Sequence, residues 1–276
     1  MVTLLVQTVV LLASQTKFFT LNHIKAVRNY SFFFTMRLLI ILFMGWVFTA
    51  SAQSLTGTRG LVKMPTGRMY PDNTLVVGAG YVPPGIFKRT AGEGTGYASG
   101  NAGLNTFVTA NILPFVEVMF RYSHEFNRQS NPLTRYFPDR MFTVRVQGLK
   151  ETKYSPEIVF GMQDVTGAFD LSLKNAFFSA TYLVATKNFE LGDYSLDTTL
   201  GYSFDFMGMP AKDFVGVFGG IEVFTPYADH MSFMWEHDSQ YMNVGVNGYF
   251  WKRLHVTVGL MRMRQAMWVL AYRYQM

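Results

Sequence analysis

The stretch YSLDTTLGYSFD, residues 194–205, decides the fold. Tyr194 and Tyr202 share one parity with the other large apolar side chains, whereas Asp197 and Asp205 fall on the opposite parity. Because successive side chains of a strand point to opposite faces, this stretch predicts a strand with an aromatic, apolar face and an acidic face. Its length matches the roughly 9–11 residues that a tilted strand needs to cross a bilayer, while soluble strands are typically about 5–6 residues long. The stretch therefore favours a transmembrane strand over a strand of a soluble sandwich.

The same alternation recurs along the chain and predicts further strands. An even number of antiparallel strands is typical of single-chain bacterial barrels. The fold class we predict is all-β: an antiparallel transmembrane β-barrel of about 12 strands over residues 74–276, preceded by a signal peptide. The predicted strands are 74–82, 104–112, 115–124, 141–150, 157–164, 176–187, 194–205, 214–223, 231–237, 240–249, 252–261 and 265–274.

The gaps between these strands alternate in length. Long gaps join the strands at 82–104, 126–139, 165–175 and 206–213, and short gaps join them at 113–114, 151–156, 188–193 and 250–251. Long surface loops and short periplasmic turns produce such an alternation in outer-membrane barrels, whereas a soluble barrel has no reason to sort its loops by side. Over the last four strands the gaps are short at both ends.

Composition supports the same fold class. Hydrophobic residues make up 49% of the chain and aromatic residues 16%, while charged residues reach only 15%. Nevertheless, no uncharged apolar run after Phe48 approaches the ~18–20 residues of a membrane helix. A barrel with lipid outside and a polar lumen combines these two properties. The chain has no Cys, which excludes disulfides, thiolate nucleophiles and cysteine zinc sites.

The net charge of +6 does not point to nucleic acid. Residues 1–52 contain four of the 24 basic residues and none of the 18 acidic ones, so much of the excess lies at the start of the chain. The remainder has no Lys/Arg cluster with interleaved stacking aromatics, and we predict no nucleic-acid partner.

The beginning of the chain has the pattern of a targeting signal. Met36-Arg37 is followed by the apolar run LLIILFMGWVF and then by Thr49-Ala50-Ser51-Ala52. A charged start, a short apolar core and an A-x-A site are the layout of a secretory signal peptide, although a single anchoring helix is the alternative. We predict a signal peptide at 36–52 cleaved after about Ala52, an over-extended N-terminus at 1–35 and an N-terminal periplasmic segment at 53–73.

Charged residues on the polar parity are candidates for the lumen. A charge facing lipid costs up to about 2–4 kcal/mol near the bilayer midplane, so these side chains should point inward. Both signs are present, and we expect their mutual pairing to close a lumen narrower than that of a porin. They are Glu117, Arg121, Arg145, Asp197, Asp205 and Glu222.

One tract could support catalysis. Residues 230–239 contain His230, Glu236, His237, Asp238 and Ser239, which supply a base, acids and a hydroxyl. Neighbouring strand residues point to opposite faces, and a general base needs its partners within hydrogen-bond reach, so we interpret the tract as a rim cluster rather than a hydrolase site. No His/Asp/Glu spacing suggests a metal, and the Gly-rich stretch after Thr90 lacks a phosphate-binding motif. We therefore predict no catalytic residues, cofactor or metal.

Several ordered segments resemble the YjbH-like outer-membrane proteins associated with bacterial exopolysaccharide operons. They are GLVKMPTGRM at 60–69, DNTL at 72–75, LPFVEVMFRY at 113–122, YSPEIVFGMQD at 154–164 and YLVATK at 182–187. The resemblance covers about residues 60–205, and the remaining strands match by pattern only. Family members are longer, so the chain corresponds to their first barrel, and it has VTGAF at 165–169 where the family tends to have a GTG run.

The resemblance implies an outer-membrane barrel that supports exopolysaccharide or capsule export, assembly or retention. The alternatives are a structural or interaction barrel with a plugged lumen and, third, a membrane-embedded hydrolase centred on His237. The expected partners are outer-membrane lipid, polysaccharide and proteins of the export machinery. Positions expected to serve barrel architecture or the lumen are Gly60, Pro65, Arg68, Glu117, Arg121, Tyr122, Asp164 and Lys187, together with Arg145, Asp197, Asp205 and Glu222.

Overall fold

The computed structural model describes residues 52–86, 102–126, 139–165, 178–207, 211, 213–228 and 230–276. The chain divides into two compact units, Met1–Val47 and Phe48–Met276, and every described residue belongs to the second. The predicted segments 1–35 and 36–52 therefore lie outside the described residues, apart from Ala52. Within the described ranges, no helix is long and apolar enough to cross a membrane.

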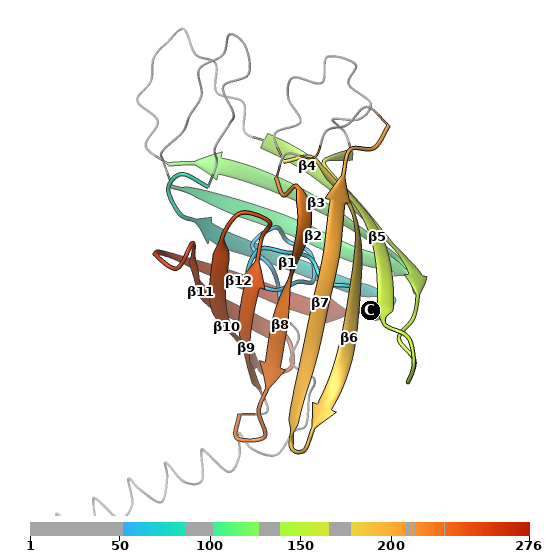
Figure 1. Cartoon of the computed structure of the whole chain (residues 1–276). Coiled ribbons are helices and arrows are strands. Elements are labelled where there is room, and N and C mark those ends of the chain that lie inside the picture. Colours follow the sequence, from blue (N-terminus) through green and yellow to red (C-terminus); the bar gives the residue numbers. More distant parts are fainter. Residues whose placement is uncertain are drawn as a thin grey trace, which may run out of the picture. The chain divides into compact units, whose positions relative to one another are not determined.

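The strands form one closed antiparallel barrel in the described part of the chain (Figure 1). The ring closes where the first strand pairs with the last, from Thr74 opposite Gln275 to Tyr81 opposite Trp268. The prediction of an all-β antiparallel barrel is confirmed. The strands are β1 (Thr74–Val82), β2 (Gly103–Leu113), β3 (Val116–Glu125), β4 (Asp139–Leu149), β5 (Glu157–Gln163), β6 (Ala180–Leu191), β7 (Tyr194–Phe204), β8 (Gly216–Phe224), β9 (Met231–His237), β10 (Met242–Phe250), β11 (Leu254–Met261) and β12 (Gln265–Gln275).

The largest boundary error concerns β6, which was predicted at 176–187. The strand ends instead at Leu191, which pairs with Tyr194, and the predicted gap shrinks to the Gly192-Asp193 turn. Gly192 has a φ of +63°, a conformation that glycine adopts without a steric penalty. Polar Asn188 remains in the strand because its side chain donates to Ser195 and Asp197 on β7.

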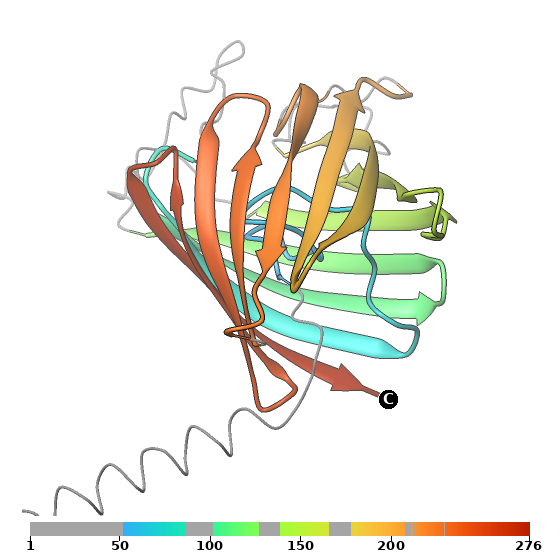
Figure 2. The same cartoon turned by 60° about the horizontal axis from the view of Figure 1, so that its bottom comes forward.

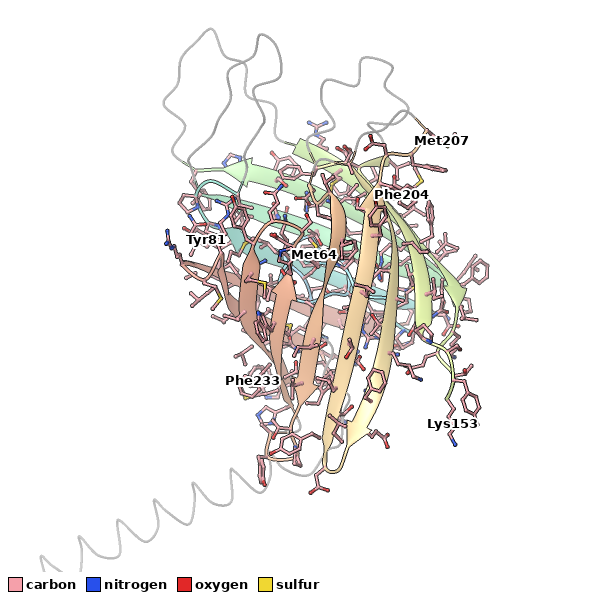
Figure 3. All side chains as sticks on the ribbon, viewed as in Figure 1. Met64, Tyr81, Lys153, Phe204, Met207 and Phe233 are labelled. Atoms are coloured by element: carbon pink, nitrogen blue, oxygen red, sulfur yellow. The ribbon has the colours of Figure 1, made fainter. Side chains whose placement is uncertain are left out.

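Side chains alternate between the two faces of the wall as the β7 pattern predicts. Asp197 and Ser203 are buried inside, whereas Leu200 and Tyr202 are exposed outside. In Figure 3, Phe233 on the outer face contrasts with Met64, which is fully buried in the interior. The barrel therefore has an apolar outer face, whereas its inner face carries charged and polar side chains together with buried Met, Phe and Val side chains.

Three inward aromatic rings lie over glycines of the neighbouring strand. The register places Phe107 opposite Gly78, Tyr182 opposite Gly161 and Phe218 opposite Gly201. A Cβ added to these glycines would lie only 2.2–2.4 Å from the ring atoms. Glycine is needed at these positions because the aromatic ring occupies the space that a side chain would take. Such pairs of ring and glycine also help to fix the register of neighbouring strands.

The connections separate the two ends of the barrel. The connections 83–102, 126–138, 164–179 and 205–215, together with the turns 238–241 and 262–264, join strands at one end, called here the long-loop end. The connections 114–115, 150–156, 192–193, 225–230 and 251–253 join strands at the other, called here the short-turn end. The predicted alternation of long and short gaps thus matches the topology.

A segment ahead of β1 fills the interior of the barrel. Residues 53–70, shown in blue in Figures 1 and 2, lie inside the ring of strands, and we call them the plug. Two isolated bridges, Gln53 with Arg59 and Gly60 with Pro65, fold the plug on itself. Its side chains are buried except for Arg59 and Arg68, which are partly buried. The stretch predicted as the periplasmic segment 53–73 thus lies within the barrel up to Tyr70.

Candidate functional site

Uncharged side chains of the wall hydrogen-bond the plug backbone. Asn105 on β2 donates to the carbonyl of Leu55 at 3.0 Å, and Thr109 on the same strand donates to the carbonyl of Gly57 at 2.5 Å. Asn111 donates to the carbonyl of Tyr70, and Thr257 on β11 donates to that of Gln53. Because a buried backbone carbonyl without a partner is costly, these contacts make burial of an irregular segment possible.

Backbone N–H groups at the turn of the plug meet a carboxylate. Glu236 on β9 accepts from the N–H of Lys63 at 2.9 Å and from the N–H of Met64 at 3.1 Å. Asn243 on β10 donates to the same carboxylate at 2.8 Å, which holds it in place. Farther along, the Thr186 hydroxyl accepts from the N–H of Gly67 at 2.7 Å.

Glycines of the wall form sockets for apolar plug side chains. A Cβ added to Gly245 on β10 would lie 2.9 Å from Val62, and a Cβ added to Gly259 on β11 would lie 3.3 Å from Val62. Gly220 on β8 faces Leu61 in the same way, at 2.7 Å. Of the three, Gly245 has Val62 as its nearest contact, so a larger residue there would displace the plug first. At Gly220 an added Cβ would also lie 2.3 Å from the carbonyl oxygen of Trp235, and at Gly259 it would lie 2.7 Å from that of Val244, so the wall itself requires glycine at these two positions.

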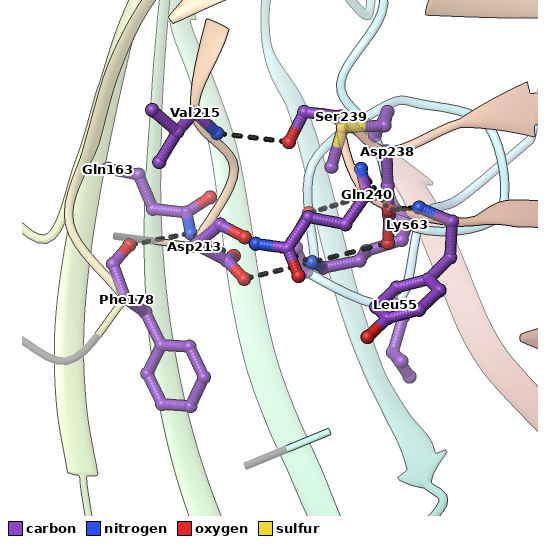
Figure 4. Close-up of polar contacts among 12 residues, drawn as sticks. Leu55, Lys63, Gln163, Phe178, Asp213, Val215, Asp238, Ser239 and Gln240 are labelled. Carbon is purple, nitrogen blue, oxygen red and sulfur yellow. Dashed lines mark hydrogen bonds and ion pairs between the residues drawn. The ribbon is translucent and has the colours of Figure 1, made fainter. Parts of the chain in front are cut away.

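A lysine cluster fixes the plug near the long-loop end (Figure 4). The Lys63 ammonium lies 3.1 Å from the carboxylate of Asp213 and 3.6 Å from that of Asp238. Gln163 donates to Asp213 at 2.7 Å, and the Ser239 hydroxyl accepts from the N–H of Val215 at 3.0 Å. One plug residue thereby joins the 205–215 connection to the 238–241 turn.

The two carboxylates set the protonation of Lys63. Burial alone would lower the pKa of its ammonium, but Asp213 and Asp238 outweigh burial and raise the pKa above the ordinary value. Burial likewise acts to raise the pKa of Asp238, yet Lys63 and the N–H groups of Tyr241 and Gln240 bring it below the ordinary value. The lysine cluster is therefore an ion pair over the whole neutral range.

An arginine cluster fixes the plug at the short-turn end. Arg68 forms two parallel bonds to Asp197 on β7, at 2.9 and 2.8 Å, the fork geometry that arginine suits best. It also pairs with Glu157 on β5 at 3.1 Å and with Glu151 in the 150–156 turn. Lys187 contacts Glu151 from the other side at 2.9 Å.

The arginine cluster also sets the protonation of Glu151. Burial acts to raise the pKa of this carboxyl, but hydrogen bonds from Lys187, the N–H of Asn188 and Arg68 lower it below its ordinary value. The pKa of Arg68 is raised, because its carboxylates outweigh burial.

A buried ion pair lies between the two clusters. Arg145 on β4 contacts Glu117 on β3 at 2.8 Å, and both side chains are fully buried. Arg145 also donates to the carbonyls of Thr66 and Arg68 on the plug, the latter at 3.1 Å. Removing one partner of a buried pair leaves an uncompensated charge, so the wall needs both Glu117 and Arg145. Because Arg145 also binds two plug carbonyls, the same side chain holds the plug in place.

The remaining predicted positions divide between plug and wall. A Cβ added to Gly60 would lie 2.3 Å from the Met64 carbonyl oxygen, which explains glycine opposite Pro65 in the plug. Arg121 points inward, toward the carbonyl of Thr56 and over the ring of Phe178. The Tyr122 side chain lies on the outer face of the wall and is half-buried.

Three predicted acidic residues have different surroundings. Asp164 is buried just past the end of β5 with a φ of +61°. Glu222 points inward opposite Asp197 and accepts from the Ser232 hydroxyl at 2.5 Å. The inward placement of Asp205 was wrong, because β7 ends at Phe204; Asp205 is exposed and accepts from the N–H of Ala211.

Sequence reasoning predicted Arg68, Arg145 and Asp197, but it missed several other side chains that hold the plug. Lys63 stood inside the quoted GLVKMPTGRM segment, but its acidic partners Asp213 and Asp238 lie in connections that carry no strand pattern. Inward parity could have singled out Glu236, Gly245 and Asn105 as residues facing the lumen. Nothing in the sequence indicated what they would contact.

The histidine tract does not assemble around His237. Its neighbour Glu236 points inward and binds the plug backbone, whereas the His237 side chain is exposed on the other face. Asp238 contacts Lys63. Among the described residues, no group of three or more His, Cys, Asp or Glu is arranged to hold a metal ion.

Comparison with known proteins places the chain in a family. The sequence model of the YjbH family, described as "Exopolysaccharide biosynthesis protein YbjH", matches residues 52–222. That range begins at the plug and extends through Glu222 on β8, so it includes both clusters' plug residues and most of the wall that surrounds them. A search of curated proteins finds no match. The chain belongs to the YjbH family of exopolysaccharide-associated proteins.

Proposed function

We propose that this protein is a non-enzymatic outer-membrane barrel that supports the export, assembly or retention of exopolysaccharide. The observation that carries the proposal is a closed wall with an apolar outer face and with charged and polar side chains buried on its inner face, in a chain of an exopolysaccharide family. A closed barrel leaves no strand edge unpaired, which is the condition for spanning a bilayer with strands.

The outer face supports a membrane location. Large apolar side chains are exposed around the ring, which water would penalise and lipid would accept. They include Val77 on β1, Val108 on β2, Phe142 on β4, Leu183 on β6, Leu200 on β7, Val217 on β8, Phe233 on β9, Val258 on β11 and Leu270 on β12.

Aromatic side chains mark both ends of this apolar belt. At the short-turn end, exposed rings lie in or beside each connection: Phe115, Tyr154, Tyr194, Tyr227 and Trp251. Toward the long-loop end, Phe126, Trp235 and Trp268 are exposed. Girdles of this kind lie at the two interfaces of outer-membrane barrels, where an aromatic ring contacts both lipid tails and headgroups.

Localisation is tested by fractionation and heat-dependent gel mobility. Inner and outer membranes are separated, and the extracted protein is run on an SDS gel with and without boiling. We expect the protein in the outer-membrane fraction, with a mobility shift on boiling as the barrel unfolds. A protein that washes off with salt, or that stays with the inner membrane without a shift, would contradict the proposal.

The glycan role is tested by deletion. A strain without the gene should lose extracellular or capsular polysaccharide, and a plasmid copy should restore it. Unchanged capsule and extracellular glycan would contradict the export role while leaving the barrel assignment intact.

The second candidate is a structural or interaction barrel, and the plug is the observation that favours it. A lumen filled by residues 53–70 is not an open pore in this conformation. An export barrel must let polymer pass through its lumen, whereas a structural barrel need not. The two roles therefore differ in whether the plug can leave the wall.

A further inference from the structure

One set of contacts between wall and plug is recognition of the plug backbone by uncharged wall side chains. Asn105, Thr109, Asn111 and Thr257 each bind a plug carbonyl, and Thr186 binds a plug N–H. These contacts do not depend on which side chains the plug carries. Amide and hydroxyl groups suit any extended polymer that presents donors and acceptors along its length, including the hydroxyl groups of a glycan.

These wall groups need a polar partner at all times. Left buried without one, each polar group costs about 1–3 kcal/mol. Withdrawal of the plug would leave these polar groups of β2, β6 and β11 without their partners, and water or another hydroxyl-rich chain could replace the plug backbone at each of them. The same surface that holds the plug is chemically suited to a neutral sugar polymer.

The plug is held unequally at its two ends. It continues into β1 through residues 71–73 at the short-turn end, where Arg68 also binds three carboxylates. Near the long-loop end its turn is held by the Lys63 cluster, by the Glu236 contacts and by apolar packing of Leu61, Val62 and Met64 against the wall. The plug can thus swing toward the short-turn end while its exit point stays tied to the wall.

We propose that the plug and a hydroxyl-rich glycan strand compete for the same inner wall, and that the plug leaves its sockets when polymer passes. This inference rests on the proposed role in exopolysaccharide export. It assigns the glycan a path along β2, β6 and β11, the strands whose amides and hydroxyls now bind plug backbone.

A disulfide between plug and wall tests the proposal. The chain has no cysteine, so a pair introduced as Val62→Cys with Gly245→Cys can bond only as designed. The ideal Cβ at Gly245 lies 2.9 Å from Val62 Cγ2, which is compatible with the Cβ separation of about 3.5–4.5 Å in disulfides. Leu55→Cys with Gly80→Cys on β1 provides a second, independent lock, because the ideal Cβ at Gly80 lies 2.9 Å from Leu55 Cδ1 and 3.2 Å from the carbonyl oxygen of Trp268 on the wall.

The matched control staples the wall without touching the plug. Val77 on β1 faces Val108 on β2 in register, and both side chains are exposed on the outer face, so Val77→Cys with Val108→Cys gives a cross-link between neighbouring strands. Each variant is expressed as the full chain in the deletion strain. Heat-dependent gel mobility verifies the barrel, and mass spectrometry of tryptic peptides verifies the disulfide.

We expect the plug lock to reduce surface glycan to the level of the deletion strain, and a membrane-permeant reductant to restore it. The wall staple should export like the wild type in both states. The disulfide yield of the plug lock should also be lower in cells making the glycan than in isogenic cells with glycan synthesis blocked.

The outcomes separate the inference from the proposed function. Normal export by both oxidised plug locks would overturn plug withdrawal, while loss of glycan in the deletion strain would still support an export role. Normal glycan in the deletion strain itself would overturn the export role and the inference together.

Discussion

The guanidinium of Arg68 ties the plug to carboxylates from three places on the wall: Asp197, Glu157 and Glu151. Its fork geometry toward Asp197 cannot be reproduced by lysine, whose ammonium is a point charge. Replacement of Arg68 would leave these carboxylates, together with inward Glu222, facing one another without this cation. Compensation of these carboxylates by Arg68 therefore holds the plug in place at the short-turn end.

Arg68→Gln should destabilise the barrel by about 3–5 kcal/mol, the cost of leaving partly buried charges uncompensated. Arg68→Lys should recover part of this loss, because it restores charge without the fork. The measurement is urea unfolding of the detergent-solubilised protein. Lys153→Gln, in the exposed turn at the same end, is the control and should leave the midpoint unchanged. A midpoint for Arg68→Gln equal to that of the control would refute the role.

Gly57 should tolerate no side chain. Its φ is +96°, and an added Cβ would lie 2.8 Å from the Phe107 ring, which is itself held over Gly78. Gly57→Ala should therefore destabilise the protein by about 2 kcal/mol or more, since strain and overpacking add. Gly192→Ala is the matched control, because Gly192 also has a positive φ but has nothing within 4 Å of its Cβ position. Equal losses in thermal stability would show that the Phe107 contact is unimportant.

Among the elements, the strands and the lengths of their connections were predictable, whereas the contacts of the plug and of the connections were not. The 194–205 alternation located β7, because one face meets polar groups and the other is apolar along the whole strand. The plug folds on itself and is surrounded by protein on all sides. Its sequence therefore has no alternation of polar and apolar residues from which its position could be predicted. The 238–241 turn likewise shows its role only in space, where Asp238 meets Lys63.

The 238–241 turn predicts a pH dependence. The pKa of Asp238 is lowered in the folded protein, so its contribution to stability is present above the ordinary value of about 3.9 and is lost as pH falls through the folded value. The pKa of Lys63 is raised, so its contribution is present below about 10.4 and is lost only as pH rises through the folded value. Both contributions are complete at neutral pH.

Asp238→Asn should therefore lower the melting temperature at pH 7. As pH falls below about 4 and through the lowered pKa of Asp238, the melting temperature of the variant should fall less than that of the wild type. Circular dichroism melting curves in detergent give both values. Asp193→Asn, at an exposed turn on the opposite end, controls for general charge effects. Parallel pH profiles for wild type and Asp238→Asn would rule out this turn as an acid-sensitive contact.

For the whole molecule, the sequence was sufficient for a closed barrel but not for what fills it. Alternating strands, gap lengths and inward charges such as Glu117 and Arg145 all concern the wall, whose pattern repeats from strand to strand. Pairing among these charges was expected to close the lumen; Glu117 and Arg145 do pair, but Asp197 binds the plug instead. Contacts such as Arg68 with Asp197 join residues far apart in the chain, and no local pattern encodes them.

A single substitution should displace the plug without opening the barrel. Gly245→Leu places a large side chain where Val62 now packs, so the plug should be displaced while the barrel still closes through its strand pairs. Trypsin reports this directly: Lys63 is buried in the wild type and should be cut only in the variant, whereas exposed Lys153 should be cut in both. Gly148→Leu, on β4 with only Ile158 O at 3.9 Å from its Cβ position, should leave Lys63 protected. A Gly245→Leu protein that shifts on boiling and still resists cleavage at Lys63 would show that the sockets do not hold the plug; cleavage at Lys63 without a mobility shift would show that plug and barrel fold as one unit.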